Sequence, residues 1–167
     1  MGLPEGRVAE LTADRDRLRA ELLRDRADRP ASPGRGIHHT ALIAADVRRT
    51  VDFYQGVLGF PLTEVFENRD YPGSTHFFFD VGNGNALAFF DLPGLDLGRY
   101  AEVLGGLHHL AISMALDQWR AAKSRLDAAG VTYQEESGTS VYLTDPDGAR
   151  VELIADPLGE MYGEAVV

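Results

Sequence analysis

The chain has 167 residues, of which 44% are hydrophobic and 25% charged, as in ordinary globular proteins. This length suits one compact domain or two small repeated modules. There is no cysteine, which excludes disulfides, thiolate catalysis and sulfur ligands, so any metal must be held by nitrogen and oxygen. No apolar run is long enough to span a bilayer and the first residues do not resemble a signal peptide. We therefore expect a cytoplasmic protein with no membrane partner.

The net charge of −10 is unevenly distributed along the chain. Residues 1–36 carry eight arginines and seven acidic residues. The remainder carries eight basic and nineteen acidic residues, a net charge of −11. A body this acidic repels phosphate backbones, so the composition argues against nucleic acid as a partner.

Residues 4–28 are rich in arginine and in acidic residues, and their pattern predicts a helix. The apolar residues form one narrow stripe that Arg15 interrupts: Val8, Leu11, Leu18, Leu22 and Leu23. Such a helix is either a solvated arm, which lies on the domain or on a partner subunit, or a short self-associating coiled coil. Residues 29–36 have the proline and glycine content of a linker, so we expect residues 1–35 to form a helical arm with its linker.

The strongest organisational signal is an internal duplication after this arm. Residues 36–43 and 106–113 share one pattern: glycine, an apolar residue, two histidines, any residue, alanine and an apolar residue. Both segments are short, apolar and free of proline, which predicts β-strands. The rest of the chain is therefore interpreted as two copies of one unit, each opening with a histidine doublet.

Each copy continues with a helical pattern and three strand-like runs. The helices are expected at 47–58 and 117–129, and the strands at 61–67, 75–81, 86–91, 131–136, 139–144 and 149–155. The order in each copy is β-α-β-β-β. We predict an α+β fold of two βαβββ modules, residues 36–92 and 106–156, within a domain of residues 36–160.

Adjacent residues of a strand point to opposite faces, so only one histidine of each doublet can face a shared cavity. In the second doublet, His109 shares its face with the small residues Ala111 and Ser113, while the alternate positions are apolar. His109 is thus the better candidate for a metal ligand, and His39 is its counterpart in the first module. A strand histidine is often only a hydrogen-bonded core residue, and His76 is interpreted in that way.

A third ligand should lie on another strand of the same cavity, and Glu152 in an apolar strand is the best carboxylate. An unpaired charge there would be costly, and Arg150 lies on the same face. The residues alone leave open whether Glu152 binds metal or forms a salt bridge with Arg150. Tyr142 falls opposite Glu152 if the intervening turn takes five residues, and its phenol could then donate a proton or a hydrogen bond.

The segments around these residues resemble the vicinal oxygen chelate superfamily, which includes glyoxalase I, extradiol dioxygenases, fosfomycin-resistance thiol transferases and bleomycin-resistance proteins. The similar stretches are Ile-His-His-Thr-Ala-Leu, Thr-Val-Asp-Phe-Tyr-Gln-Gly-Val-Leu-Gly-Phe, Leu-His-His-Leu-Ala-Ile and Tyr-Leu-Thr-Asp-Pro-Asp-Gly-Ala-Arg-Val-Glu-Leu. The resemblance implies a cupped mixed sheet. It also implies a metal held by the histidine that opens each module and by a glutamate on the last strand. Those positions are His39, His109 and Glu152 here.

The resemblance further implies a divalent-metal-dependent enzyme that acts on a small substrate with two adjacent oxygens. Two histidines and one carboxylate with open positions are typical of non-haem Fe(II) oxygenases. We therefore expect an extradiol-type dioxygenase, an oxidoreductase in which Tyr142 hydrogen-bonds a substrate oxygen. Fe(II) or Mn(II) is the first expectation for the metal, with Ni, Co and Zn as alternatives, and a homodimer is the expected assembly.

Three departures from the family patterns keep other functions open. Glyoxalase I has a further carboxylate on the fourth strand of the first module, where Phe89 occupies the approximate position. Extradiol enzymes have an acid–base histidine just before that strand, where this chain has Asn85, and the thiol transferases have a threonine at Ala41. The alternatives are a glyoxalase-like lyase, a thiol transferase, or a protein that binds a small molecule such as an antibiotic without catalysis. The complete set of three ligands favours an enzyme.

Overall fold

The computed structural model describes residues 2–167, which divide after Arg35 into two compact units. The first unit contains α1 (Glu5–Leu22) and a short 3₁₀ helix, η1 (Arg26–Asp28). The single helix predicted at 4–28 is therefore shorter, and a separate turn follows it. Within residues 2–167, no helix is long and apolar enough to cross a membrane.

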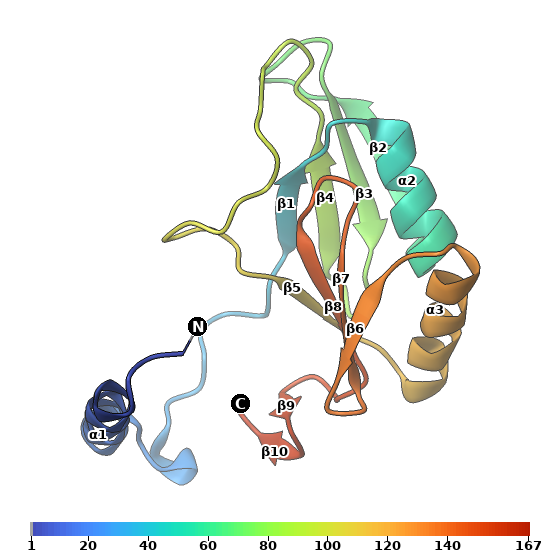
Figure 1. Cartoon of the computed structure of the whole chain (residues 1–167). Coiled ribbons are helices and arrows are strands. Elements are labelled where there is room, and N and C mark those ends of the chain that lie inside the picture. Colours follow the sequence, from blue (N-terminus) through green and yellow to red (C-terminus); the bar gives the residue numbers. More distant parts are fainter. Residues whose placement is uncertain (1) are drawn as a thin grey trace. The chain divides into compact units, whose positions relative to one another are not determined.

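The second unit contains two four-stranded mixed sheets, each built by one βαβββ module (Figure 1). The first module comprises β1 (His39–Ile43), α2 (Val47–Val51), η2 (Asp52–Leu58), β2 (Leu62–Glu67), β3 (Thr75–Asp80) and β4 (Ala86–Phe90). The second comprises β5 (Leu110–Ser113), α3 (Leu116–Ala128), β6 (Tyr133–Glu136), β7 (Ser140–Thr144) and β8 (Arg150–Ile154). The strand orders are β1-β4-β3-β2 and β5-β8-β7-β6, and the first pair in each is parallel. The predicted α+β fold of two such modules is confirmed. The expected cupped mixed sheet is present in one chain as two separate four-stranded sheets.

The C-terminal segment, for which the sequence predicts no structure, forms a small hairpin. Its strands are β9 (Glu160–Met161) and β10 (Glu164–Ala165). Two-residue strands are too short to show the alternation of apolar and polar residues by which strands are found.

The helix of the first module begins and ends at specific contacts. The carboxylate of Asp46 accepts a hydrogen bond of 2.8 Å from the backbone three residues later, as an N-cap does. The helix widens into the π-helical η2 and ends at Gly59, whose φ of 87° is left-handed. Arg125 of α3 donates to the carbonyls of Val57 and Leu58 at 2.8 and 2.7 Å. This contact joins the two modules.

Replacing Gly59 with alanine should destabilise the fold by about 2 kcal/mol or more, because strain and lost hydrogen bonds add. The added Cβ would lie 2.8 Å from a guanidinium nitrogen of Arg125, at a left-handed backbone position. Urea unfolding measures the loss. Gly130→Ala is the matched control, since Gly130 is also left-handed but no atom lies within 4 Å of the added Cβ. Equal losses in the two variants would show that the Arg125 contact contributes nothing.

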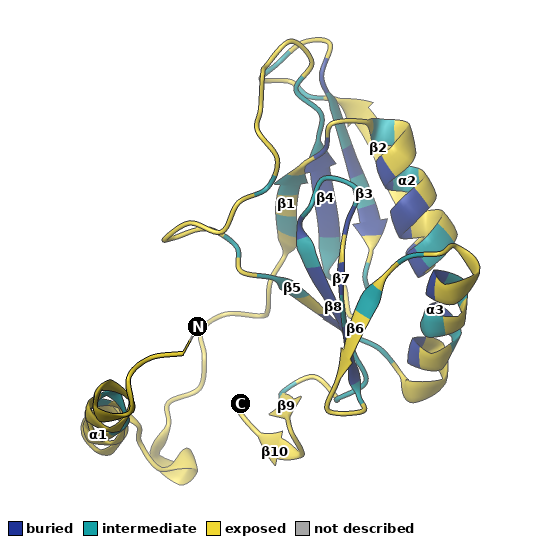
Figure 2. Ribbon diagram, in the orientation of Figure 1, coloured by how far each residue is buried: buried dark blue, intermediate teal, exposed yellow. Residues whose placement is uncertain are grey.

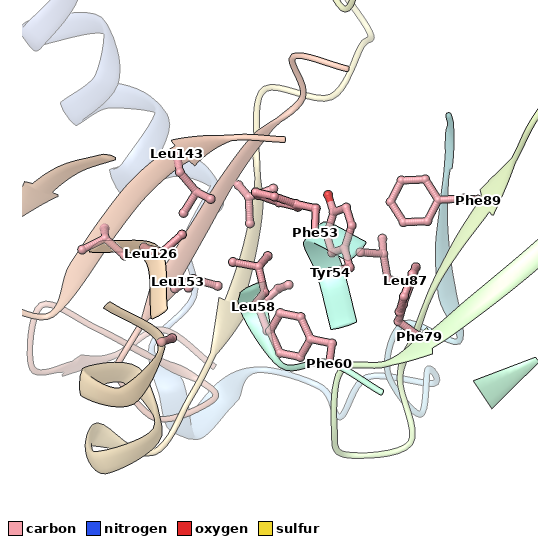
Figure 3. Packing of buried hydrophobic residues seen from close by; sticks show 14 of the residues in the cluster. Phe53, Tyr54, Leu58, Phe60, Phe79, Leu87, Phe89, Leu126, Leu143 and Leu153 are labelled. Atoms are coloured by element: carbon pink, nitrogen blue, oxygen red, sulfur yellow. The ribbon is translucent and has the colours of Figure 1, made fainter. Parts of the chain in front are cut away.

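One hydrophobic core joins the two modules, with residues from both sheets and from the helices between them (Figure 3). Its large members include Tyr54, Leu58, Phe77, Phe79, Leu87, Phe89, Trp119, Leu126, Val141, Leu143, Val151 and Leu153. Figure 2 shows that the buried residues concentrate in the central strands and on one side of the helices. Because strand residues alternate between faces, every second residue of each sheet points away from this core. We call these the outer faces.

Candidate metal centre

The predicted ligands lie on the outer faces of the two sheets. His109, directly before β5, and Glu152 of β8 share the outer face of the second sheet, where they are in contact. His39 is the first residue of β1. The residues of β1 that face the core alternate with those on the side of His39, so His39 lies on the outer face of the first sheet. Within residues 2–167, no three histidine, aspartate or glutamate side chains are grouped as a metal site would require. One chain therefore brings two of the three candidates together.

His109 and Glu152 form the centre of this arrangement. The Nε2 atom of His109 lies 3.1 Å from Oε2 of Glu152, whose side chain is only 8% exposed. The other carboxylate oxygen accepts a hydrogen bond from the hydroxyl of Ser140. Tyr142 pairs with Glu152 across β7 and β8, which confirms the predicted register, and its ring centre lies 5.7 Å from that of His109.

Arg150 does not form the salt bridge with Glu152 that the sequence left open. Its guanidinium pairs with Glu102 at 2.9 Å and contacts Nε2 of His108 at 3.2 Å. A guanidinium can only donate, so Nε2 of His108 is the acceptor in this contact. The Nδ1 of His108 lies 2.7 Å from Nδ1 of His109. Nδ1 of His109 therefore faces His108, and its Nε2 faces Glu152.

The histidine doublet of the first module repeats this contact. The Nδ1 atoms of His38 and His39 lie 2.9 Å apart. In both modules, the first histidine thus engages Nδ1 of the second and leaves Nε2 of the second for another partner. Ligand histidines commonly use one ring nitrogen for the metal and fix the other by a hydrogen bond. Strand alternation alone gave the first histidine of each doublet no role.

The phenol of Tyr142 is poised to donate a hydrogen bond. Burial raises the pKa of Tyr142, and its hydrogen bond to the Glu152 carboxylate raises this pKa further. The phenol therefore keeps its proton at neutral pH. Ser140, which sequence reasoning missed, lies two residues before Tyr142, so the alternation of a strand could have placed it on the same face.

The position equivalent to Glu152 in the first module is Ala88, not Phe89. β1 pairs Ala41 with Ala88, just as β5 pairs Ala111 with Glu152. Phe89 points into the core and is 1% exposed. The sequence estimate is wrong by one residue because β4 is apolar on both faces and offers no alternation to count. The first module thus has no second carboxylate at this position.

Aromatic rings cover the outer face of the first sheet. They belong to Phe66, His76, Phe78 and Phe90. The ring of His76 stacks on that of Phe90 with centres 3.8 Å apart, and Phe78 lies 6.3 Å from the ring of His39. This face therefore offers an apolar wall next to one candidate ligand.

Replacing His76 with phenylalanine should make the protein less sensitive to acid. Nε2 of His76 is buried without a hydrogen-bond partner among the described residues. Desolvation lowers the pKa of His76 from 6.5, and the nearby His39 lowers it further. As the pH falls below 6.5, His76 binds a proton more readily in the unfolded chain than in the folded protein, so the free energy of unfolding falls.

In His76→Phe this part of the loss is absent, and stability at pH 7 is unchanged or higher because the buried polar atom is gone. Thermal unfolding at neutral and at mildly acidic pH measures both effects. A variant that loses as much stability in acid as the wild type would contradict this account.

Two cavities, of about 710 and 970 Å³, lie along β1 and β5, and neither is lined by the three candidate ligands. The first cavity borders Thr40 and all of β5, and the second borders β1 and the connector that follows β4. β1 and β5 each end their sheet, and no strand of the described chain pairs with their outer edges. These edges are surfaces that a further chain can cover.

Comparison with known families identifies the superfamily of the second unit. The Glyoxalase/Bleomycin resistance protein/Dioxygenase superfamily matches residues 36–153, which is more than half of the chain. The chain belongs to this superfamily. The matched region contains both histidine doublets, Tyr142 and Glu152, whereas the arm lies outside it.

Relatives in the superfamily carry different activities in their names. "Putative ring-cleaving dioxygenase MhqA" of Bacillus subtilis is 32% identical over 142 residues, which are 77% of this chain and 42% of that protein. The chain thus spans less than half the length of MhqA. Lactoylglutathione lyase of Escherichia coli O157:H7 is 33% identical over 128 residues, which are 71% of this chain and 90% of the lyase.

Solved structures from the superfamily share the fold. The glyoxalase family protein of Enterococcus faecalis superposes with a TM-score of 0.57 at 25% identity, covering 72% of this chain and 97% of the other. The fosfomycin resistance protein FosX of Listeria monocytogenes superposes with a TM-score of 0.55 at 25% identity, covering 75% of this chain and 94% of the other.

Proposed function

We propose that this superfamily member is a divalent-metal-dependent enzyme whose ligands are His39, His109 and Glu152. The observation that carries the proposal is the pair formed by His109 and Glu152, with donor atoms 3.1 Å apart. Neighbouring ligands about 2.1 Å from an octahedral ion lie about 3 Å apart, so this pair fits such an ion. Nitrogen and oxygen donors suit Fe(II) or Mn(II) first, and also Ni, Co and Zn.

The third ligand, His39, would come from a second copy of the chain. His39 lies on the outer face of one sheet and the other two ligands on the outer face of the other, with the shared core between these sheets. A two-fold symmetric homodimer can join the first module of each copy to the second module of the other. The free edges of β1 and β5, with the cavities beside them, supply surface for this contact. Each dimer would then hold two sites.

The residues around the pair have separable roles at such a site. A bound ion supplies Lewis-acid and oxygen-activating chemistry to a small substrate with two adjacent oxygens. Ser140 holds one oxygen of Glu152 and so fixes the direction of the other. Tyr142 donates a hydrogen bond to a substrate oxygen because it keeps its proton at neutral pH. The partner's Phe78 would provide an apolar wall for an aromatic ring.

Ring cleavage of an aromatic diol, as in extradiol dioxygenases, is the first candidate reaction. Two histidines and one carboxylate leave open positions for a substrate and a second reactant, the aromatic outer face suits a ring, and MhqA is named for ring cleavage. A glyoxalase-type lyase reaction is the second candidate, since lactoylglutathione lyase matches along 90% of its length. Ala88, where that class has a second carboxylate, counts against the lyase reaction.

Metal analysis of protein purified without chelator tests the site. We expect about one Mn(II) or Fe(II) per chain in the wild type, and binding weakened at least about 100-fold in His109→Ala. His76→Phe is the control, because it keeps all three proposed ligands and changes a neighbouring aromatic position. Stoichiometric metal retained in His109→Ala would eliminate the site.

Turnover of three substrates then separates the reactions. Catechols with oxygen report ring cleavage, the hemithioacetal of methylglyoxal and glutathione reports lyase activity, and fosfomycin reports a resistance enzyme. Turnover of the hemithioacetal alone would replace the first candidate by the second. Binding of these molecules without turnover under any metal would indicate a binding protein instead of an enzyme.

A further inference from the structure

The arm helix α1 has an apolar stripe that the other described residues of its own unit, residues 2–35, do not bury. No side chain of α1 is buried, and Val8, Leu18 and Leu22 are 49%, 56% and 73% exposed. Most helices in proteins gain their stability by packing an apolar face against a neighbour. We therefore expect the stripe to pack against a partner surface.

The spacing of the stripe is that of a coiled coil. Steps of three and four residues alternate along it, as the a and d positions of heptads do. The positions are Val8, Leu11, Arg15, Leu18 and Leu22. Coiled coils tolerate one polar residue at such a position, at a cost in stability, and use it to restrict the partner and the register.

The residues that follow α1 leave this stripe open. They fold back beside its last turns, and among them Arg29 donates to the carbonyl of Arg24 at 3.1 Å. On the helix side, the groove between them and the helix is lined by Asp16, Arg19, Ala20 and Leu23. At 100° per residue, Asp16 and Ala20 lie on the side of the helix opposite Leu18, and Leu23 borders only its C-terminal end. Within residues 2–35, Val8 and Leu18 therefore stay accessible to another molecule.

We propose that α1 helices of two copies of this chain pair through this stripe as an antiparallel two-stranded coiled coil. The position of Arg15 sets the orientation. In a parallel pair, Arg15 would face the partner's Arg15 in the same layer, and two like charges would meet inside the seam. In an antiparallel pair with Val8 opposite the partner's Leu18, Arg15 packs beside the partner's Leu11 instead.

The charges that flank the stripe complement one another in the same orientation. Glu5 and Arg19 lie along one edge of the stripe, and Arg7 and Glu21 along the other. Antiparallel pairing sets each edge against the same edge of the partner, so Arg7 meets the partner's Glu21 and Glu5 meets the partner's Arg19. Glu5, Arg19 and Glu21 make no ion pair within the described residues, so their charges remain to be matched.

Asp14 is the one flanking charge that would meet its own counterpart, and it is already paired with Arg17 of its own helix. A parallel pair would match fewer charges along α1. Asp14 would meet the partner's Arg19, while Arg7 would meet the uncharged Thr12 of the partner subunit. Charge and apolar spacing thus favour the same arrangement.

Disulfide trapping in the full-length protein tests the proposal, because the chain has no cysteine of its own. Val8→Cys and Leu18→Cys chains are co-expressed and oxidised in a glutathione buffer. Disulfides need Cβ atoms about 4 Å apart, which facing seam positions approach and outward positions do not. We expect cross-links between positions 8 and 18, identified by peptide mass, and little linkage when Leu18→Cys is expressed alone.

Ala13→Cys, which faces away from the stripe, replaces Val8→Cys in the matched control. We expect at least about tenfold less linkage to Leu18→Cys in this control, since no seam contact raises the local thiol concentration. Self-linkage of Leu18→Cys would overturn the antiparallel arrangement, and equally slow linkage in all combinations would overturn pairing altogether. The readout does not depend on the metal. Loss of the proposed metal centre with intact linkage would reject the proposed function alone.

Discussion

Co-expressed His39→Ala and His109→Ala chains should recover metal binding and activity that neither variant has alone. If each site takes His39 from one copy and His109 with Glu152 from the other, both homodimers lack every site. In the heterodimer, both substitutions fall in one site and the second site is intact. Random pairing yields half heterodimers, so about a quarter of the wild-type sites should return.

The measurement is metal per chain in the co-expressed mixture, together with the rate on whichever substrate the wild type turns over. A mixture of His109→Ala with Glu152→Ala is the matched control. Both of those substitutions lie in the second module, so every site is damaged whichever chains pair, and no recovery is expected. Recovery in the control, or none in the first mixture when all variants are folded dimers, would rule out sites shared in this way.

Tyr54→Ala should cost about 4 kcal/mol of folding free energy, since large-to-small changes of buried aromatics cost this much. Tyr54 is completely buried, and its ring lies 4.9 Å from Phe89 and 5.4 Å from Phe79. Its hydroxyl donates to Asp145 at 3.2 Å, in the turn between β7 and β8. The residue therefore links the helix of one module to the sheet of the other.

Tyr54→Phe removes the hydroxyl but keeps the ring, and it should lower the free energy of unfolding by about 1–2 kcal/mol. Burial raises the pKa of Asp145 because it removes water from the carboxylate, so losing the hydroxyl as a donor costs stability. The cost is limited because the backbone N–H groups of Asp147 and Ala149 still donate to this carboxylate. Urea unfolding measures both variants. Tyr133→Phe, which removes an exposed hydroxyl bonded to Asp127, should stay within about 0.5 kcal/mol of the wild type. A Tyr54→Phe variant as stable as this control would show that the buried contact is not stabilising.

The order of the elements could be predicted from the sequence because each one shows its own periodicity. The duplicated doublets fix where each module begins, and turn residues separate the strands that follow. Strand alternation also places His109, Tyr142 and Glu152 on one face, and the register of β7 with β8 confirms that Tyr142 lies opposite Glu152. These inferences use only local geometry, which neighbouring residues determine.

The relation of His39 to the other two candidates could not be predicted in this way. It depends on how the modules pack, and that follows from contacts between residues far apart in the sequence, such as Arg125 with Val57 and Tyr54 with Asp145. The contact between the two histidines of each doublet was missed because strand alternation predicts that adjacent side chains point to opposite faces.

The shared core has a consequence for assembly. If the proposed dimer forms, this core holds both of its unlike contact surfaces, and each copy is then bivalent. Bivalent bodies that join unlike surfaces either close into a ring or grow into an open filament, and the angle between the surfaces decides which. Packing at Tyr54 and Arg125 sets that angle. Core substitutions far from any ligand could therefore convert a closed pair into a polymer without touching the chemistry.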